Sequence, residues 1–153
     1  MCDSQPCPCG SGAPYGACCA PLHRGDRPAA DAVALMRSRY SAFITGQVAY
    51  LWRTMHPQHE DRAGGEQHVL VGLRRAVRSH RFLGLRILDS CSGTDEAQVL
   101  FHARVFVQGV NRSFLELSTF LLEPEGWLYF AGLGRAQAEA PDLDIDGFQR
   151  LSP

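Results

Sequence analysis

The stretch that decides how the N-terminal part folds reads Cys7-Pro8-Cys9-Gly10-Ser11-Gly12-Ala13-Pro14-Tyr15-Gly16-Ala17-Cys18-Cys19. It gathers four of the six cysteines of the 153-residue chain. Residues 1–30 are rich in Gly, Pro and Cys and show no apolar periodicity, so a crosslink must hold them in place of a core. In a reducing compartment such a cluster indicates a metal site, because disulfides do not persist there.

Four thiolates meet the tetrahedral preference of zinc and leave no coordination position open. A closed shell of this kind is structural and does not activate water. Gly10 and Gly12 allow the backbone to turn sharply, so that the sulfurs can converge. Iron in a tetrathiolate site is the alternative that geometry alone does not exclude. We predict one structural zinc ion, without which the segment is unfolded. The predicted ligands are Cys7, Cys9, Cys18 and Cys19.

The rest of the chain changes from a helical to a strand-like pattern. Asp31 is a plausible N-cap for a helix whose apolar residues recur every three or four positions as far as Leu51, with Gly46 as an interruption or kink. A second helix is predicted over residues 66–79. Four strand-like runs follow, separated by turn sequences, at residues 82–91, 97–108, 112–122 and 127–133. Helices followed by an antiparallel meander predict an α+β domain.

Composition excludes several classes of function. The net charge of −1 gives no overall attraction to nucleic acid or to acidic membranes. The chain contains no lysine, which excludes a Schiff-base lysine and a P-loop lysine. No apolar run approaches the ~20 residues of a membrane-spanning helix. The first six residues lack the features of a secretory signal peptide, so we expect a cytoplasmic protein.

The cysteine stretch resembles the SEC-C motif, the zinc knuckle also found at the C-terminus of the SecA translocation ATPase, with Cys19 where SecA-type knuckles often carry His. Five further motifs follow the knuckle: Pro21-Leu22-His23, Ala34-Leu35-Met36-Arg37-Ser38-Arg39-Tyr40-Ser41-Ala42-Phe43, His56-Pro57, Glu116-x-Ser118-x-Phe120 and Gly126-Trp127-x-Tyr129. Through them, residues 5–133 resemble the YchJ family of uncharacterised bacterial proteins.

The resemblance implies a fold in which the knuckle is followed by a nuclear transport factor 2-like cone, with helices packed on a curved, mainly antiparallel sheet. It implies no assigned activity. Docking of the SecA knuckle to protein partners supports a binding role here by analogy only. We therefore expect a knuckle at residues 1–25, a cone domain at residues 26–134 and a flexible acidic tail at residues 135–153.

Cone domains often enclose a pocket, so polar residues of the cone are candidates for a site. They are His56, His80, His102, Arg104, Glu116 and Ser118. Alternation along residues 97–108 puts Val99 and Phe101 on a core face, and His102 and Arg104 on the other face. If the turn at residues 109–111 pairs residue 104 with residue 116, Arg104 and Glu116 form a cross-strand ion pair, with residue 102 opposite residue 118. A structural role for this ion pair is favoured over a catalytic site. If the cone does hold a catalytic site, the candidate residues are Glu116, His102 and His56.

Two further groups leave alternatives open. Arg37 and Tyr40 share a helix face, whereas Arg39 points elsewhere; these residues bind an anionic ligand or, the safer interpretation, cap carbonyls or form salt bridges. Trp127 and Tyr129 share a strand face and are expected to fill the core rather than stack on a ligand.

These features favour a non-catalytic binding or adaptor protein, in which the knuckle docks a protein partner and the cone is a scaffold or holds a small ligand. A small hydrolase or isomerase using the cone pocket, with Glu116 and one histidine as acid–base groups, is the alternative. Nucleic-acid binding through the knuckle and the arginine-rich helices is disfavoured by the net charge. The sequence leaves open whether the protein is an enzyme.

Overall fold

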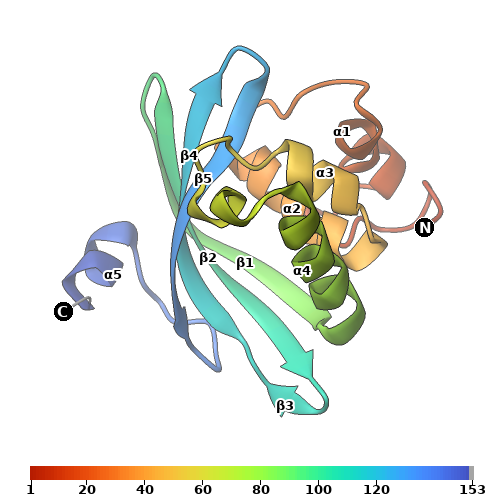
Figure 1. Cartoon of the computed structure of the whole chain (residues 1–153). Helices are drawn as coiled ribbons and strands as arrows, with labels where there is room; N and C mark the ends of the chain where they lie inside the picture. Colours follow the sequence, from red (N-terminus) through yellow and green to blue (C-terminus); the bar gives the residue numbers. More distant parts are fainter. Residues whose placement is uncertain (152–153) are drawn as a thin grey trace.

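A strongly curved antiparallel sheet is the central element of the molecule (Figure 1). The computed structural model describes residues 1–151. The strands lie in the order β1-β2-β4-β5, and the short β3 pairs with β2. Their bounds are β1 (Arg81–Ser92), β2 (Glu96–Val107), β3 (Val110–Asn111), β4 (Phe114–Glu123) and β5 (Gly126–Ala136). The predicted α+β architecture with an antiparallel meander is confirmed.

Short helices pack together on one face of the sheet (Figure 1). They are η1 (Tyr15–Ala17), α1 (Ala20–Arg24), α2 (Ala32–Thr45), α3 (Val48–Arg53), η2 (Glu60–Gly64) and α4 (Glu66–Ser79). Asp31 caps α2, because its carboxylate accepts a hydrogen bond of 2.7 Å from the backbone N–H of Ala34. Gly46, at φ 75°, adopts the left-handed conformation that ends α2, and the chain resumes as α3.

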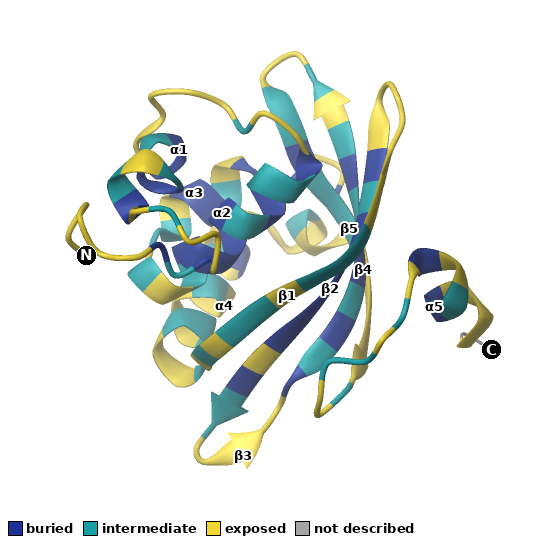
Figure 2. Ribbon diagram, turned by 180° about the vertical axis from the view of Figure 1, so that it is seen from behind, coloured by how far each residue is buried: buried dark blue, intermediate teal, exposed yellow. Residues whose placement is uncertain are grey.

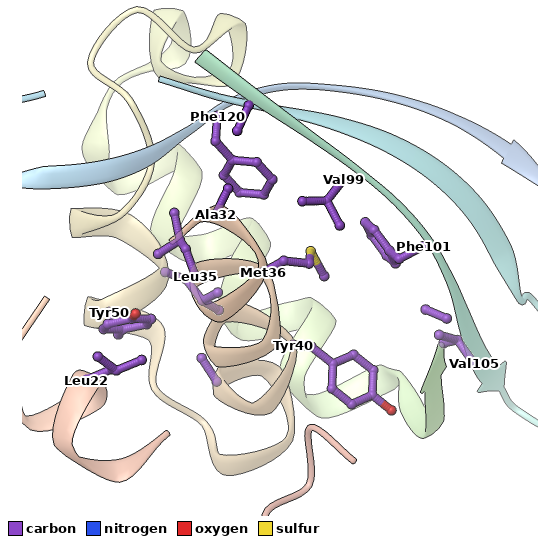
Figure 3. Close-up of a cluster of buried hydrophobic side chains, with 14 residues drawn as sticks. Leu22, Ala32, Leu35, Met36, Tyr40, Tyr50, Val99, Phe101, Val105 and Phe120 are labelled. Atoms are coloured by element: carbon purple, nitrogen blue, oxygen red, sulfur yellow. The ribbon is translucent and has the colours of Figure 1, made fainter. Parts of the chain in front are cut away.

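The main core lies between α2 and the face of the sheet that we call the inner face. Met36 of α2 points toward Val99 and Phe101 of β2, and Tyr40 lies on the side of Val105 (Figure 3). Alternate residues of β2 supply this face, and Val99 and Val105 are fully buried. The predicted core face of this strand is confirmed.

The register between β2 and β4 differs from the predicted one by three residues. Glu116 lies opposite Phe101, and Ser118 lies opposite Val99. The chain uses the intervening residues to form β3 and a connection in which Ser113 accepts a hydrogen bond from the backbone of β2, so β4 begins later than expected. An odd shift exchanges the two faces of a strand. The predicted pairs, 104 with 116 and 102 with 118, are therefore wrong, and Glu116 faces the helices.

The opposite, outer face of the sheet is partly covered by the C-terminal segment. Helix α5 (Ile145–Leu151) packs the side chains of Ile145 and Phe148 against leucines of β2 and β4. The imidazole of His102 donates from Nε2 to the carbonyl oxygen of Gln137 at 2.7 Å, and Asp89 accepts from the backbone N–H of Ile145 at 2.9 Å. Figure 2 shows buried positions of α5 facing the sheet. His102 is therefore buried on the outer face, where it bonds to the segment that follows β5.

This arrangement differs from the loose tail expected at residues 135–153. Strand β5 continues to Ala136, and two apolar residues three positions apart anchor the short helix α5 among acidic neighbours. Two apolar residues are too short a pattern to predict a helix from sequence. The helix is stabilised by packing on the apolar face of the strands beneath it, which the local sequence does not show. Residues 152–153 of the expected tail lie outside the described residues. The domain division at residues 25 and 134 stays a prediction.

None of the helices within residues 1–151 has the length and apolar character needed to cross a membrane.

Candidate functional site

The sulfur atoms of Cys7, Cys9, Cys18 and Cys19 converge, and all four lie within 4.8 Å of one another. The Sγ–Sγ distance is 3.6 Å from Cys9 to Cys18 and 3.8 Å from Cys18 to Cys19. Four sulfurs arranged tetrahedrally at a Zn–S distance of about 2.3 Å have Sγ–Sγ distances of about 3.8 Å. All four cysteines are free of disulfides. The cluster therefore fits, and could hold, a metal ion.

The backbone between the cysteine pairs turns where the sequence predicts it. Gly10 and Gly12 have φ of 79° and 87°, in the left-handed region that residues with a Cβ rarely adopt. The backbone N–H of Cys7 donates to the carbonyl of Ala13 at 2.9 Å and closes the loop. These turns bring sulfurs that are distant in sequence to one point.

The thiols of Cys7, Cys9 and Cys19 differ in their pKa values. Burial raises the pKa of Cys7 to about 11, while a hydrogen bond from the Cys19 thiol lowers the pKa of Cys9 to about 4. The hydrogen bond to Cys9, followed by burial, raises the pKa of Cys19. Four negative charges in so small a volume need a cation, and a divalent metal ion supplies it when it binds.

Two arginines attach the knuckle to the helices of the cone. Arg37 of α2 donates from Nη1 to the carbonyl oxygen of Cys9 at 2.8 Å. Arg53 of α3 donates from Nη2 to the carbonyl oxygen of Leu22 at 2.9 Å, close to the end of α1. Arg37 thus binds a backbone carbonyl, as the safer of its two interpretations predicted.

A buried histidine completes this attachment. The Nδ1 atom of His23 accepts a hydrogen bond from the Tyr15 hydroxyl at 2.7 Å, and its Nε2 donates to the carbonyl oxygen of Ser38 at 2.8 Å. A neutral imidazole satisfies both partners, and burial lowers the pKa of His23, which favours that neutral form. Sequence reasoning did not single out this role, because the two partners lie on different elements.

A second candidate site is a cavity of about 160 Å³ between α2 and the inner face of the sheet. Aromatic rings form most of its wall, and four polar side chains face it. The rings are Tyr40, Phe43, Phe82, Phe101 and Phe114, and the polar residues are Arg39, Glu116, Ser118 and Tyr129. Tyr129, expected only to fill the core, thus also lines this cavity.

The carboxylate of Glu116 is held inside the cavity. Its Oε1 atom accepts hydrogen bonds from the Ser118 hydroxyl at 2.7 Å and from the Tyr129 hydroxyl at 2.8 Å. A Cβ at Gly132 would collide with both Glu116 Oε1 and the Tyr129 hydroxyl. The glycine therefore makes room for this arrangement. Burial, followed by the negative charge of Glu116, raises the pKa of Tyr129.

Arg39 is a buried cation at the same cavity. Only 6% of its surface is exposed. Its Nη1 donates to the carbonyl of Leu51 at 2.9 Å and to the Thr54 hydroxyl at 2.6 Å. The guanidinium lies 4.7 Å from the centroid of the Tyr129 ring. Among residues 1–151, no ion pair joins Arg39 to Glu116 or to another carboxylate.

The structure brings only Glu116 and Ser118 of the six polar candidates into the cavity. His56 instead donates from Nε2 to Glu123 at 2.8 Å and accepts from the backbone N–H of Gln58 at Nδ1, so both of its nitrogens are occupied. His80 interacts with the end of α4, and Arg104 is exposed on the outer face.

A residue missed by sequence reasoning, His59, lies beside Tyr129. The two ring centroids are 5.0 Å apart. His59 is buried, and burial lowers the pKa of its imidazole. Nothing in the surrounding loop sequence signals this position, because it depends on how the loop after α3 folds back on β5.

Comparison with known proteins identifies both parts of the chain. Residues 4–21 match the SEC-C motif, and residues 31–132 match the family model described as "YchJ, middle NTF2-like domain". A UPF0225 protein of Geobacter sulfurreducens is 37% identical over 131 residues, which cover 84% of this chain and 78% of that protein.

Solved structures of SEC-C motif containing proteins have a fold similar to that of this chain. A SEC-C motif containing protein from Rhodopseudomonas palustris has a TM-score of 0.74 at 34% identity, covering 84% of this chain and 98% of that one. Another from Psychrobacter arcticus has a TM-score of 0.71 at 25% identity, covering 86% and 84%. An NTF2-like protein from Streptomyces avermitilis, at 16% identity and a TM-score of 0.53, shares the fold over 70% of this chain and 95% of that one. This chain belongs to the YchJ family, in which a SEC-C motif precedes an NTF2-like domain.

Proposed function

We propose that the protein binds one structural zinc ion through Cys7, Cys9, Cys18 and Cys19, and that it acts as a non-catalytic binding protein. The convergence of four sulfurs at near-tetrahedral spacing carries the zinc proposal. Because four thiolates close the coordination shell, the ion supports the fold of residues 7–19 and performs no chemistry on a substrate.

Metal analysis of the purified chain tests the zinc site. We expect one zinc ion per chain, and its loss in Cys9→Ser. Cys91→Ser is the matched control, because Cys91 is exposed and belongs to β1. Iron in place of zinc, or the same metal content in both variants, contradicts the proposal.

The knuckle is further proposed to dock a protein partner. Gly10, Ser11, Gly12 and Ala17 are exposed, while Arg37 and His23 attach the other side of the knuckle to α2. A partner bound at the exposed tip would therefore contact a surface that is rigidly connected to the cone.

Affinity capture with surface variants tests this adaptor role. We expect Ala17→Arg to lose specific partners while it keeps zinc, and Ala138→Arg, an exposed position after β5, to keep both. Partner sets that are identical for the two variants and the wild type would refute docking through the tip.

A small isomerase or hydrolase is the second candidate, and the position of Glu116 inside the cavity favours it. His56 and His102 are not its acid–base partners in this arrangement, because both engage groups outside the cavity. Ser118 and Tyr129 donate to Glu116 instead. Proton exchange at the α-carbon of cyclohexanone in D2O, followed by NMR, tests the isomerase. A rate equal to that of Glu116→Gln eliminates it.

A further inference from the structure

We propose that the cone cavity binds a neutral single-ring molecule whose polar group carries an acceptor oxygen beside a hydrogen-bond donor, as in a carboxamide. Arg39 binds the acceptor, and Glu116 binds the donor. The inference rests on the proposed role of the cone as a holder of a small ligand, and it names the chemical class of that ligand.

The size of the cavity limits the ligand to one ring. Its volume is about 160 Å³. An engineered apolar cavity of about 150 Å³ in another protein takes up benzene. Rings from α2, β1, β2 and β4, including Tyr40, Phe82 and Phe101, favour an aromatic or other flat apolar body. One small polar substituent is all that the remaining space admits.

Arg39 provides hydrogen-bond donors at one side of the cavity. Its Nη1 is occupied by Leu51 and Thr54, whereas within residues 1–151 no hydrogen bond is made by its Nε or Nη2. Arg39 lines the cavity and is almost fully buried. The N–H groups that Arg39 does not use within the protein are available to an acceptor that enters the cavity.

Glu116 provides the complementary acceptor. The hydroxyls of Ser118 and Tyr129 both donate to Oε1, and within the described part of the chain nothing donates to Oε2. The two hydroxyls hold this carboxylate in position, and Gly132, which has no side chain, leaves the space that it occupies. A ligand N–H or O–H group satisfies the remaining oxygen.

The charges of the cavity select a neutral ligand. Arg39 and Glu116 face the same small volume and are not joined to each other as an ion pair. A ligand carboxylate at Arg39 is repelled by Glu116, and a ligand ammonium group at Glu116 is repelled by Arg39. A neutral group with an adjacent acceptor and donor bridges the two without either repulsion.

Three single-ring probes test the inference on the full, zinc-loaded chain: benzamide, its isostere benzoate, and the apolar toluene. Titration followed by NMR is expected to show saturable benzamide binding, at least about tenfold tighter than that of the other two, since a lost hydrogen bond or an added repulsion is worth about 1.4 kcal/mol or more. Tighter binding of benzoate or toluene refutes the ligand class but retains the cone as a ligand holder. No saturation by any probe refutes both.

Variants locate the binding. Glu116→Gln removes the negative charge, so we expect benzamide to bind about tenfold more weakly and the preference over benzoate to disappear. Ala103→Leu fills the cavity and is expected to abolish binding of all three probes. Arg104→Met, on the exposed outer face, is the control and should bind as the wild type does. Should Glu116→Gln not fold, Ala103→Val serves instead; unchanged benzamide affinity in the folded variant overturns the assignment to this cavity.

Discussion

Replacing Phe148 with alanine should release helix α5 from the outer face of the sheet. Phe148 is 2% exposed and packs with Ile145 against Leu100, Leu115 and Leu117. Truncating a buried phenylalanine to alanine typically costs about 3–5 kcal/mol. The helix has 7 residues, and holding each residue costs about 1–2 kcal/mol of conformational entropy. Ile145 and the hydrogen bond to Asp89 do not offset that cost alone.

The released tail regains chain entropy, so the loss of global stability is limited to the low end of the range, about 3 kcal/mol. For a chain of this size 1 kcal/mol corresponds to about 2–4 °C in Tm, so we expect Tm to fall by about 6–12 °C. Differential scanning calorimetry measures this change, and hydrogen exchange of residues 143–151 reports whether the tail has detached.

Gln149→Ala is the matched control, because Gln149 is exposed on the same helix. It should leave both Tm and exchange close to the wild-type values. If Phe148→Ala keeps the protection of residues 145–151 and shifts Tm by less than about 2 °C, then α5 does not depend on this contact and the reasoning is wrong.

Three further outcomes are expected. Gly132→Ala should lower the free energy of unfolding in urea by about 1–3 kcal/mol, because its Cβ collides at Glu116, whereas Gly134→Ala, whose Cβ would meet only a carbonyl oxygen at 3.7 Å, should not. Burial lowers the pKa of His59 below its ordinary 6.5, so the folded chain binds fewer protons at this residue than the unfolded chain does. The stability that is present above pH 6.5 is therefore lost as the pH falls. Denaturant titrations of His59→Gln should show a smaller loss of unfolding free energy between pH 7 and 5 than those of the wild type. Arg37→Gln loses the charged donor to the Cys9 carbonyl and should release zinc to a chelator several-fold faster; an unchanged rate would mean that this contact does not stabilise the knuckle.

Local patterns were sufficient where neighbours in sequence are also neighbours in space. The helix predicted at residues 66–79 is α4, and Asp31 caps α2 as expected. The cysteine cluster is equally local, because thirteen residues with two left-handed glycines bring all four sulfurs together. Glu116 could not be placed in this way. Its face depends on the length of the connection before β4, and one odd change in that length moves the side chain from solvent to the cavity.

By itself the sequence determined the metal-binding cluster, the order of helices and strands, and the inward face of β2, because spacing and periodicity express these directly. Only the tertiary structure decided which distant parts of the chain contact these elements. Arg37 and His23 attach the knuckle to α2, and α5 packs on the leucines of the outer face. Likewise, Arg39 and Glu116 meet at one cavity although 77 positions separate them in sequence. Such contacts depend on strand register and helix packing, which a single sequence does not specify locally.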